Sequence, residues 1–468
     1  MTATFAVVGH PNKGKSSIVA TLAEDERIAI SATPGTTHRA SRYTFSLDNK
    51  PLYTLVDTPG FQRGKAVLNW LESQAANASD RAGLVRSFVD EHEGDARFHD
   101  ECELLRPIVD GAGILYVVDG SKPYGAEFEI EMQILQWTGQ PRMALINLIG
   151  EGDYLADWRR ALGQYFSIVR VFDAMQADFP ARVNLLRAFA ELDETWRPQM
   201  DDAIAALEDE YRRRLQRSAA EISSMLIDCL TFTEQRVLEA DGDAGALGEV
   251  LTENLLGRIR HREQRARTIV QGYYRHDRLQ RDEPALALLN IDLFTSEGWE
   301  LFGLSKTQLL ITGAMTGAIA GLGIDALVGG ATLLLGAGIG AVVGGIGSWF
   351  GADELAKTRV LGSSLGGRTL HVGPIEAVNF PWVMLGRAWV HHHLVQERNH
   401  ALRASLSTSL GDQQNLMDTI PEEIRSPLAK IMRGLQKSGR SEKLLAHLQA
   451  LILRLLQRSP LGDQTSDC

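Results

Sequence analysis

Eight residues near the start of the chain constrain its fold more than any other segment. Residues Gly9 to Ser16 read Gly-His-Pro-Asn-Lys-Gly-Lys-Ser, which satisfies the pattern G-x-x-x-x-G-K-[ST]. This segment follows the apolar run Phe5 to Val8 and precedes an apolar helical run, which is the strand–loop–helix context that the phosphate-binding motif requires. The chain is therefore expected to begin with an α/β domain that binds a nucleotide.

Short apolar runs alternate with helix-like segments from Thr4 to about Arg197. This alternation is typical of parallel strands that are covered on both faces by helices. Six strands are expected, at Phe5 to Val8, Arg42 to Ser46, Leu52 to Val56, Gly113 to Val118, Ala144 to Asn147 and Ile168 to Phe172. The connection from Gly60 to Gly113 is longer than a crossover needs, which indicates inserted helices. Residues 1–197 are thus expected to form a P-loop domain with a mostly parallel sheet.

The motif supplies the groups that hold phosphates. Its glycines let backbone N–H groups wrap the phosphate oxygens, Lys15 brings a cation to the outer phosphates, and the Ser16 hydroxyl suits Mg²⁺. The residues expected to bind the nucleotide in this segment are Asn12, Lys13, Gly14, Lys15, Ser16 and Ser17.

Two further segments follow in the order that a phosphate site requires. Asp57 to Gly60 reads Asp-Thr-Pro-Gly directly after an expected strand, so the Asp57 carboxylate would hold Mg²⁺ and Gly60 would offer its N–H to a terminal phosphate. Between the two motifs, Pro34 to Arg39 carries hydroxyl groups that could reach the same ion.

These three segments resemble those of the TrmE–Era–EngA group of bacterial GTPases, over about residues 4 to 175. The resemblance implies binding of GTP and GDP and hydrolysis of GTP with Mg²⁺. It makes Thr37 the better candidate for the magnesium ligand of the flexible segment, with Thr36 a close second. Asn12 matches the asparagine that helps to hold K⁺ in potassium-dependent members of the group. The expected metal ligands are then Ser16, Thr37 and Asp57, and the expected catalytic residues are Lys15, Thr37 and Gly60.

One departure from related GTPases concerns hydrolysis. Phe61 occupies the position of the water-orienting glutamine of Ras-like proteins, and an aromatic ring cannot polarise water. A slow intrinsic rate is therefore expected, with the missing group supplied by a cation, a partner in a homodimer or another side chain. Gln62 is either that side chain or a glutamine that faces solvent.

A second departure concerns the base. The group carries N-K-x-D at the position where this chain reads Asn147-Leu148-Ile149-Gly150, without the lysine and the aspartate. Asp153 either substitutes for the missing carboxylate or caps the following helix. Ala174 matches the alanine of the last base-binding segment of the group. We expect Asn147, Asp153 and Ala174 to contact the base, and the resemblance favours GTP over ATP.

The remainder of the chain has a helical pattern. Long amphipathic helices are expected in residues 198–305, first after Pro198 and again from about Leu247 to Leu279, either as a stalk or as an ordinary packed domain. Residues 353–468 are expected to be mainly helical, with strand character around Thr369 to Val378 and two helical regions that end near Gln457. This layout also resembles a bacterial group of GTPases whose C-terminal domain has no assigned function.

The segment 306–352 is the strongest compositional anomaly of the chain. Asp325 is the single charged residue between Leu309 and Phe350, and glycines recur every fourth residue on both sides of it. This pattern predicts an apolar, glycine-rich helical hairpin that spans or enters a membrane. The alternative is a soluble pair of helices, because glycine lowers the hydrophobicity of the segment.

Composition limits the partners. The 48 basic and 59 acidic residues give a formal charge of −11, so DNA is not expected as a partner. The strand pattern at the N-terminus leaves no room for a cleavable signal, which favours a cytoplasmic protein. The arginines between Arg258 and Arg281 form either a surface for anionic lipids or an ordinary paired helix face. His391, His392 and His393 are expected to be surface imidazoles.

These observations predict a membrane-associated GTP-binding protein at the inner face of the cell membrane. It would hydrolyse GTP with Mg²⁺ and act as a nucleotide-dependent switch, and its helical half would contact a membrane or a membrane protein. The alternatives are a nucleotide-binding scaffold with little hydrolysis and a soluble GTPase that acts on RNA or ribosomes.

Overall fold

The computed structural model describes most of the chain, in segments separated by gaps. The described segments are residues 2–24, 39–150, 152–175, 177–238, 243–274, 293–294, 359–362, 368–397, 419–438 and 442–458. The chain divides into two compact units, and the division falls between Tyr211 and Arg212.

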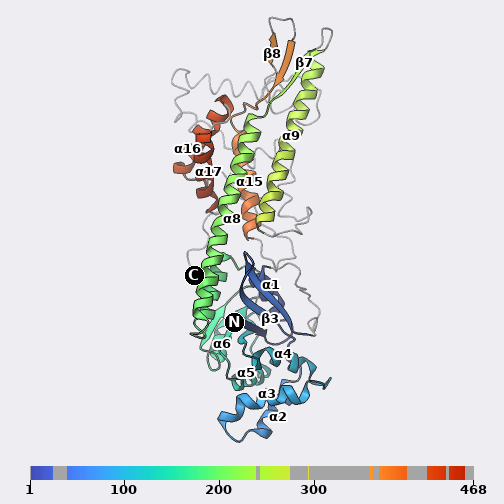
Figure 1. Cartoon of the computed structure of the whole chain (residues 1–468), viewed down its shortest axis with the longest axis vertical. Helices are drawn as coiled ribbons and strands as arrows, with labels where there is room; N and C mark the ends of the chain where they lie inside the picture. Colours follow the sequence, from blue (N-terminus) through green and yellow to red (C-terminus); the bar gives the residue numbers. More distant parts are fainter. Residues whose placement is uncertain are drawn as a thin grey trace. The chain divides into compact units, whose positions relative to one another are not determined.

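The first unit contains a six-stranded sheet (Figure 1). Its strands, in chain order, are β1 Ala3–Val8, β2 Ser41–Leu47, β3 Lys50–Asp57, β4 Gly113–Asp119, β5 Arg142–Asn147 and β6 Ile168–Val171. They lie in the order β2-β3-β1-β4-β5-β6, and only β2 is antiparallel to its neighbour. All six predicted strands are confirmed, and the sheet is mostly parallel as expected.

Helices cover both faces of this sheet. The helices of the first unit are α1 Lys15–Ala23, α2 Gly64–Gln74, η1 Ala78–Asp80, α3 Arg81–His92, α4 His99–Val109, α5 Glu127–Trp137, α6 Leu155–Leu162, α7 Phe179–Ala190 and the first turns of α8 Arg197–Thr231. Phe5 and Val7 of β1 pack in one core with α1, α7 and the start of α8. Ala6 and Val8 pack in the other core with α2 to α6. This alternation follows from the two-residue period of a strand.

The predicted insertion between Gly60 and Gly113 is confirmed, since α2, η1, α3 and α4 all lie within it. Its helices share an aromatic cluster in which the ring centroids of Phe88 and His92 lie 4.5 Å apart and that of Trp70 lies 5.3 Å from Phe88. The insertion is therefore a packed part of the first unit, with α4 returning the chain to β4.

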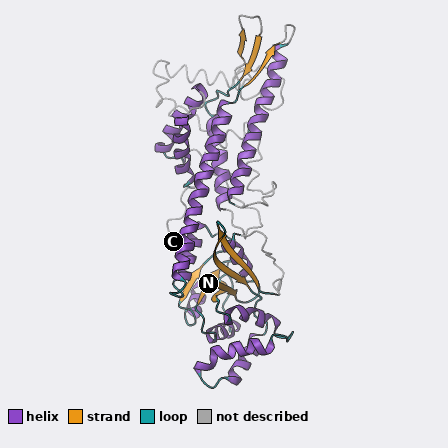
Figure 2. Ribbon diagram, in the orientation of Figure 1, coloured by secondary structure: helices purple, strands orange, loops and turns teal. Residues whose placement is uncertain are grey.

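The second unit is mainly helical (Figure 2). Its elements are the remainder of α8, β7 Glu234–Leu238, α9 Ala244–Tyr273, β8 Arg359–Gly362, β9 Arg368–Val372, α15 Phe380–Glu397, α16 Glu422–Ser438 and α17 Glu442–Leu456. The strands form an antiparallel sheet in the order β7-β9-β8. The two long helices and the strand near Thr369 are confirmed. Among the described residues three helices follow that strand, where two helical regions were expected, and β7 was missed because its sequence Glu-Gln-Arg-Val-Leu is largely polar.

The expectation that the three adjacent histidines lie at the surface is wrong. His391, His392 and His393 are buried in α15, a helix with almost no exposed face among its described side chains. His391 Nε2 lies 3.1 Å from the side-chain amide of Gln271, and His392 Nε2 lies 2.8 Å from the hydroxyl of Tyr274, both on or next to α9. Such polar tips can be buried because each finds a partner.

Several arginines of α9 are paired, as in the ordinary alternative, whereas Arg275, Arg278 and Arg281 lie outside the described residues. Arg262 contacts Glu221 at 2.7 Å and Asp228 at 2.8 Å on α8, and Arg258 contacts Glu234 at 3.0 Å. Their charge is therefore balanced within the second unit.

The predicted hairpin at 306–352 lies outside the described residues, as does Thr37. Among the helices that the structure does describe, none combines the length and apolar composition needed to cross a membrane.

Candidate nucleotide site

The loop between β1 and α1 has a backbone that its glycines make possible. Gly9 has φ +138°, and a Cβ there would lie 2.4 Å from the carbonyl oxygen of Val117. Gly14 has φ +81°, and a Cβ there would lie 2.2 Å from the amide of Asn147. Asn12 adopts φ 60° with an exposed side chain. This tight loop leads into the N-terminus of α1, where backbone N–H groups and the helix dipole favour phosphate.

Lys15 lies inside this loop. Its amine donates hydrogen bonds to the carbonyl oxygens of Gly9 at 3.1 Å and His10 at 3.0 Å. Burial lowers the pKa of Lys15 from 10.5 to about 8, against the opposing effect of Asp57. An anionic phosphate near this amine would favour its charged form.

Ser16 and Asp57 meet at the carboxyl ends of β1 and β3. The Ser16 hydroxyl donates to Asp57 Oδ2 at 2.7 Å, although the two residues lie 41 positions apart. A hydroxyl and a carboxylate side by side next to a phosphate loop are the oxygen ligands that Mg²⁺ prefers. These two of the three predicted metal ligands are therefore suitably placed, whereas the third, Thr37, lies outside the described residues.

The segment that follows Asp57 is fixed against the loop. A Cβ at Gly60 would lie 2.6 Å from the backbone nitrogen of Pro11, so only glycine allows this approach. The Phe61 side chain is buried in the core beneath α2 to α6, while Gln62 is exposed. The aromatic ring of Phe61 therefore lies in the protein interior, where an apolar side chain is expected.

Asn147 connects two loops of the site. Its side-chain nitrogen donates to the carbonyl oxygen of Lys13 at 3.2 Å, and its side-chain oxygen accepts from the backbone N–H of Ala174 at 3.1 Å. Ala174 in turn accepts from the hydroxyl of Thr21 through its carbonyl oxygen at 2.8 Å. Asn147 and Ala174 are therefore brought together as predicted, at the edge of the phosphate loop.

Asp153 is placed differently. Its exposed carboxylate accepts a hydrogen bond from the backbone N–H of Leu155 at 3.2 Å, at the start of α6. This is the helix-capping alternative of the sequence analysis. The neighbouring side chains of Ile149 and Met175 are large, apolar and about half exposed, beside the loops of Asn147 and Ala174.

Lys13 has a side-chain environment that the motif did not reveal. Its amine lies 3.9 Å from the buried carboxylate of Asp119 and 5.5 Å from the centroid of the Phe128 ring. Burial lowers the pKa of Lys13. The side chain therefore anchors the loop to β4 and α5, which leaves its backbone N–H as the group available for a phosphate.

A second contact that anchors the loop was also not predicted from the sequence. His10 Nδ1 lies 2.9 Å from Glu131 Oε1, and the other oxygen of this buried carboxylate accepts from the Tyr116 hydroxyl at 2.8 Å. Neither carboxylate that anchors the loop was predicted. The only sequence signal for Asp119 was its position at the end of an apolar strand, and no sequence signal distinguished Glu131.

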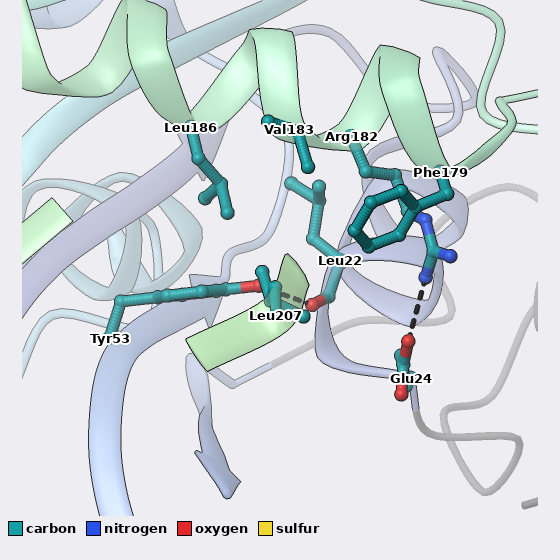
Figure 3. A pocket seen from close by; sticks show the side chains of 8 residues that line it. All are labelled: Leu22, Glu24, Tyr53, Phe179, Arg182, Val183, Leu186 and Leu207. Atoms are coloured by element: carbon teal, nitrogen blue, oxygen red, sulfur yellow. Dashed lines mark hydrogen bonds and ion pairs between the residues drawn. The ribbon is translucent and has the colours of Figure 1, made fainter. Parts of the chain in front are cut away.

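A small pocket elsewhere in the first unit is not a nucleotide site (Figure 3). Its volume is about 10 Å³, close to the space that one water molecule needs. It lies beside the ion pair of Glu24 and Arg182, at 2.8 Å, and the Tyr53 hydroxyl bond to the carbonyl oxygen of Leu22, at 2.6 Å. These contacts close the end of α1 against β3 and α7.

Two family models match this chain, one in its N-terminal part and one in its C-terminal part. Residues 159–452, more than half of the chain, match the family model described as "Domain of unknown function (DUF3482)". The chain belongs to this family. Residues 4–147 match the model described as "50S ribosome-binding GTPase". The resemblance to a bacterial GTPase domain joined to a C-terminal domain of unknown function is thereby confirmed.

Individual proteins match parts of the chain. The GTPase Der of Thioalkalivibrio sulfidiphilus is 28% identical over 175 residues, which are 35% of this chain and 37% of the relative. The GTPase Der of Mycoplasmoides gallisepticum is 39% identical over 82 residues, 18% of each chain. A structure of Era in complex with MgGDPNP and a segment of 16S ribosomal RNA covers 57% of this chain and 89% of that chain, with 16% identity and a TM-score of 0.29. The chain thus spans well under half the length of these two curated relatives.

Proposed function

We propose that this protein binds GTP and GDP and hydrolyses GTP with Mg²⁺, as a nucleotide-dependent switch. The observation that carries the proposal is the hydrogen bond of 2.7 Å between Ser16 and Asp57, beside the buried amine of Lys15. A cation, a hydroxyl and a carboxylate at the N-terminus of one helix are what a Mg²⁺-bound triphosphate requires.

Each residue has a definable task in such a reaction. Lys15 would exchange its two carbonyl partners for oxygens of the outer phosphates, and the N–H groups from Lys13 to Ser17 would bind the remaining oxygens. Gly60 would offer its N–H to the terminal phosphate that water attacks. Mg²⁺, held by Ser16 and Asp57 with Thr37 as the proposed third ligand, would offset negative charge on the phosphates.

The base and a second cation belong to the proposal as well. Asn147 and Ala174, which are hydrogen-bonded to each other, are the proposed contacts of the base, and the match of residues 4–147 to a GTPase model supports guanine. Asp153 caps α6 here and would have to turn to reach a base. Asn12, exposed in the loop with φ 60°, is the proposed K⁺ ligand that compensates for the buried Phe61.

The test is a binding titration followed by a turnover assay. The purified full chain should bind GDP and a slowly hydrolysed GTP analogue more tightly than the corresponding adenine nucleotides, and it should release phosphate from GTP over many turnovers. Binding of GTP without release of phosphate would instead favour the alternative function, a nucleotide-binding scaffold. Equal affinity for guanine and adenine would contradict the base assignment.

We also propose that the protein associates with a membrane. The support is the sequence of residues 309–350, in which Asp325 is the only charged residue. The full chain should remain in the membrane pellet after carbonate extraction, and deletion of this segment should release it. Co-sedimentation with ribosomes without detergent would instead favour a ribosome-associated GTPase.

A further inference from the structure

Helix α4 carries two carboxylates that accept hydrogen bonds from backbone N–H groups outside the helix. Glu101, which is almost fully buried, accepts hydrogen bonds from the N–H of Gln62 at 2.9 Å and from that of Arg63 through the same oxygen. Glu103, two positions later, accepts from the N–H of Ala40 at 2.8 Å. Two acidic side chains of one helix thus hold two segments that are distant in sequence.

Both segments adjoin the residues that would meet the terminal phosphate. Gln62 and Arg63 follow Gly60 by two and three positions. Ala40 follows the proposed magnesium ligand Thr37 by three positions and begins the approach to β2. α4 is therefore linked to Gln62 and Arg63, which follow Gly60 in the chain, and to Ala40, which directly precedes β2.

The link to Gly60 is short and has few degrees of freedom. Gly60 touches Pro11 of the phosphate loop, Phe61 is buried in the core, and the next two N–H groups point to Glu101. Three consecutive anchors fix this segment, and the last of them, Glu101, belongs to α4.

Glu101 also accepts from the N–H of Arg63, the N-cap residue of α2, which no intrahelical carbonyl reaches. Arg63 occupies the N-cap position of α2 and provides no side-chain hydrogen bond, although the first N–H groups of a helix need acceptors. A carboxylate at this end is further favoured by the helix dipole. Burying a charge is costly unless it is hydrogen-bonded. The buried Glu101 carboxylate therefore needs these two N–H groups as donors, and the two N–H groups need Glu101 as their acceptor.

We propose that α4 sets the relative positions of the two segments that border the terminal phosphate, with Glu101 and Glu103 as positioning residues for hydrolysis. This inference rests on the proposed GTPase function. Neither side chain is assigned contact with the nucleotide, since each acts through backbone N–H groups. The inserted helices between Gly60 and Gly113 thereby gain a role in the reaction itself.

The experiment compares three single variants of the full chain: Glu101→Ala, Glu101→Gln and Glu103→Ala. Loss of a charge-assisted acceptor in Glu101→Ala should lower kcat for GTP by about tenfold or more. Affinity for GDP should stay within about twofold, because GDP has no terminal phosphate for Gly60 to meet. Glu101→Gln keeps an acceptor oxygen and should recover part of the rate.

A matched control separates positioning from general destabilisation. Glu93 is an exposed carboxylate that pairs with Arg106 of α4 at 3.2 Å and, within the described residues, has no hydrogen bond to Ala40, Gln62 or Arg63. Glu93→Ala should leave kcat unchanged. If the Glu101→Ala variant does not fold, the Glu103→Ala variant becomes the test, because the Glu103 side chain is only half-buried. This variant should have a lower kcat and keep its affinity for GDP.

A wild-type kcat in folded Glu101→Ala and Glu103→Ala would overturn the inference while leaving the proposed function intact. Failure of the wild type to hydrolyse GTP would contradict the proposed function instead. In that case the affinity ratio between a slowly hydrolysed GTP analogue and GDP remains decisive: it should fall in Glu101→Ala, and an unchanged ratio would end the proposal.

Discussion

The side-chain nitrogen of Asn147 donates a hydrogen bond to the carbonyl oxygen of Lys13 at 3.2 Å, across 134 positions of the chain. The same amide also accepts from the N–H of Ala174. One buried side chain therefore joins the phosphate loop to the loop beside the expected base, and a change there should affect both.

Asn147→Ala should weaken binding of every nucleotide by a similar factor. The change leaves a buried carbonyl oxygen and a buried N–H without their partner, at a cost of about 1–3 kcal/mol each. Titration with GDP and ADP tests this, together with thermal unfolding of the first unit. A loss confined to GDP would show that Asn147 reads the base rather than tying the loops.

Nucleotide affinity should depend on pH through Lys15. Its pKa is about 8 in the ligand-free protein, and bound phosphates would raise it, so binding takes up a proton above this pH. GDP affinity should be nearly constant below pH 7 and fall by about tenfold between pH 7 and pH 9. Lys15→Ala should bind weakly at all pH values, without this slope. A flat profile in the wild type would mean that Lys15 stays charged in the free protein.

Asn12 provides the test of the monovalent cation. GTP hydrolysis should be faster in K⁺ than in Na⁺ at equal ionic strength, and Asn12→Ala should remove the difference while GDP affinity is retained. Because Asn12 has φ 60°, a conformation that strains alanine but not glycine, Asn12→Gly is the matched variant that removes the side chain without straining the loop. Equal rates in the two salts for the wild type would exclude the cation from the mechanism.

The second unit should lose stability in mild acid. Burial lowers the pKa of His392 to about 3, and that of His391 also falls, whereas unfolded histidine titrates near 6.5. The unfolded state then binds more protons below pH 6.5, so the stability present above that pH is lost as pH falls. Each such histidine costs about 1 kcal/mol between pH 6.5 and 5.5. His392→Gln should reduce the slope of thermal stability against pH, and an unchanged slope would contradict this account.

The sequence predicted those features of the site that depend on local pattern. Ser16 and Asp57 were recognisable because each lies in a short motif directly after an apolar strand, and parallel strands bring such ends together. The six strands followed from the same apolar runs. These predictions needed no knowledge of long-range packing.

Other residues of the site could not be found in this way. Glu101 and Glu131 lie on helices that carry other glutamates, and in sequence they look like ordinary charged positions. Their burial depends on which N–H or hydroxyl groups the packed helices bring near them. The histidines of α15 were misjudged for the same reason, since Gln271 and Tyr274 lie more than a hundred positions away.

Helix α8 has a practical consequence for dissecting the protein. Its first turns contribute Met200, Ala203, Ile204 and Leu207 to the core that also contains Phe5, and the compact first unit ends only at Tyr211. A nucleotide-binding fragment cut at residue 197 would expose that core and should aggregate or misfold. A fragment that keeps its GTPase fold must carry part of a helix that belongs to the other unit, so neither half can be excised at a natural loop.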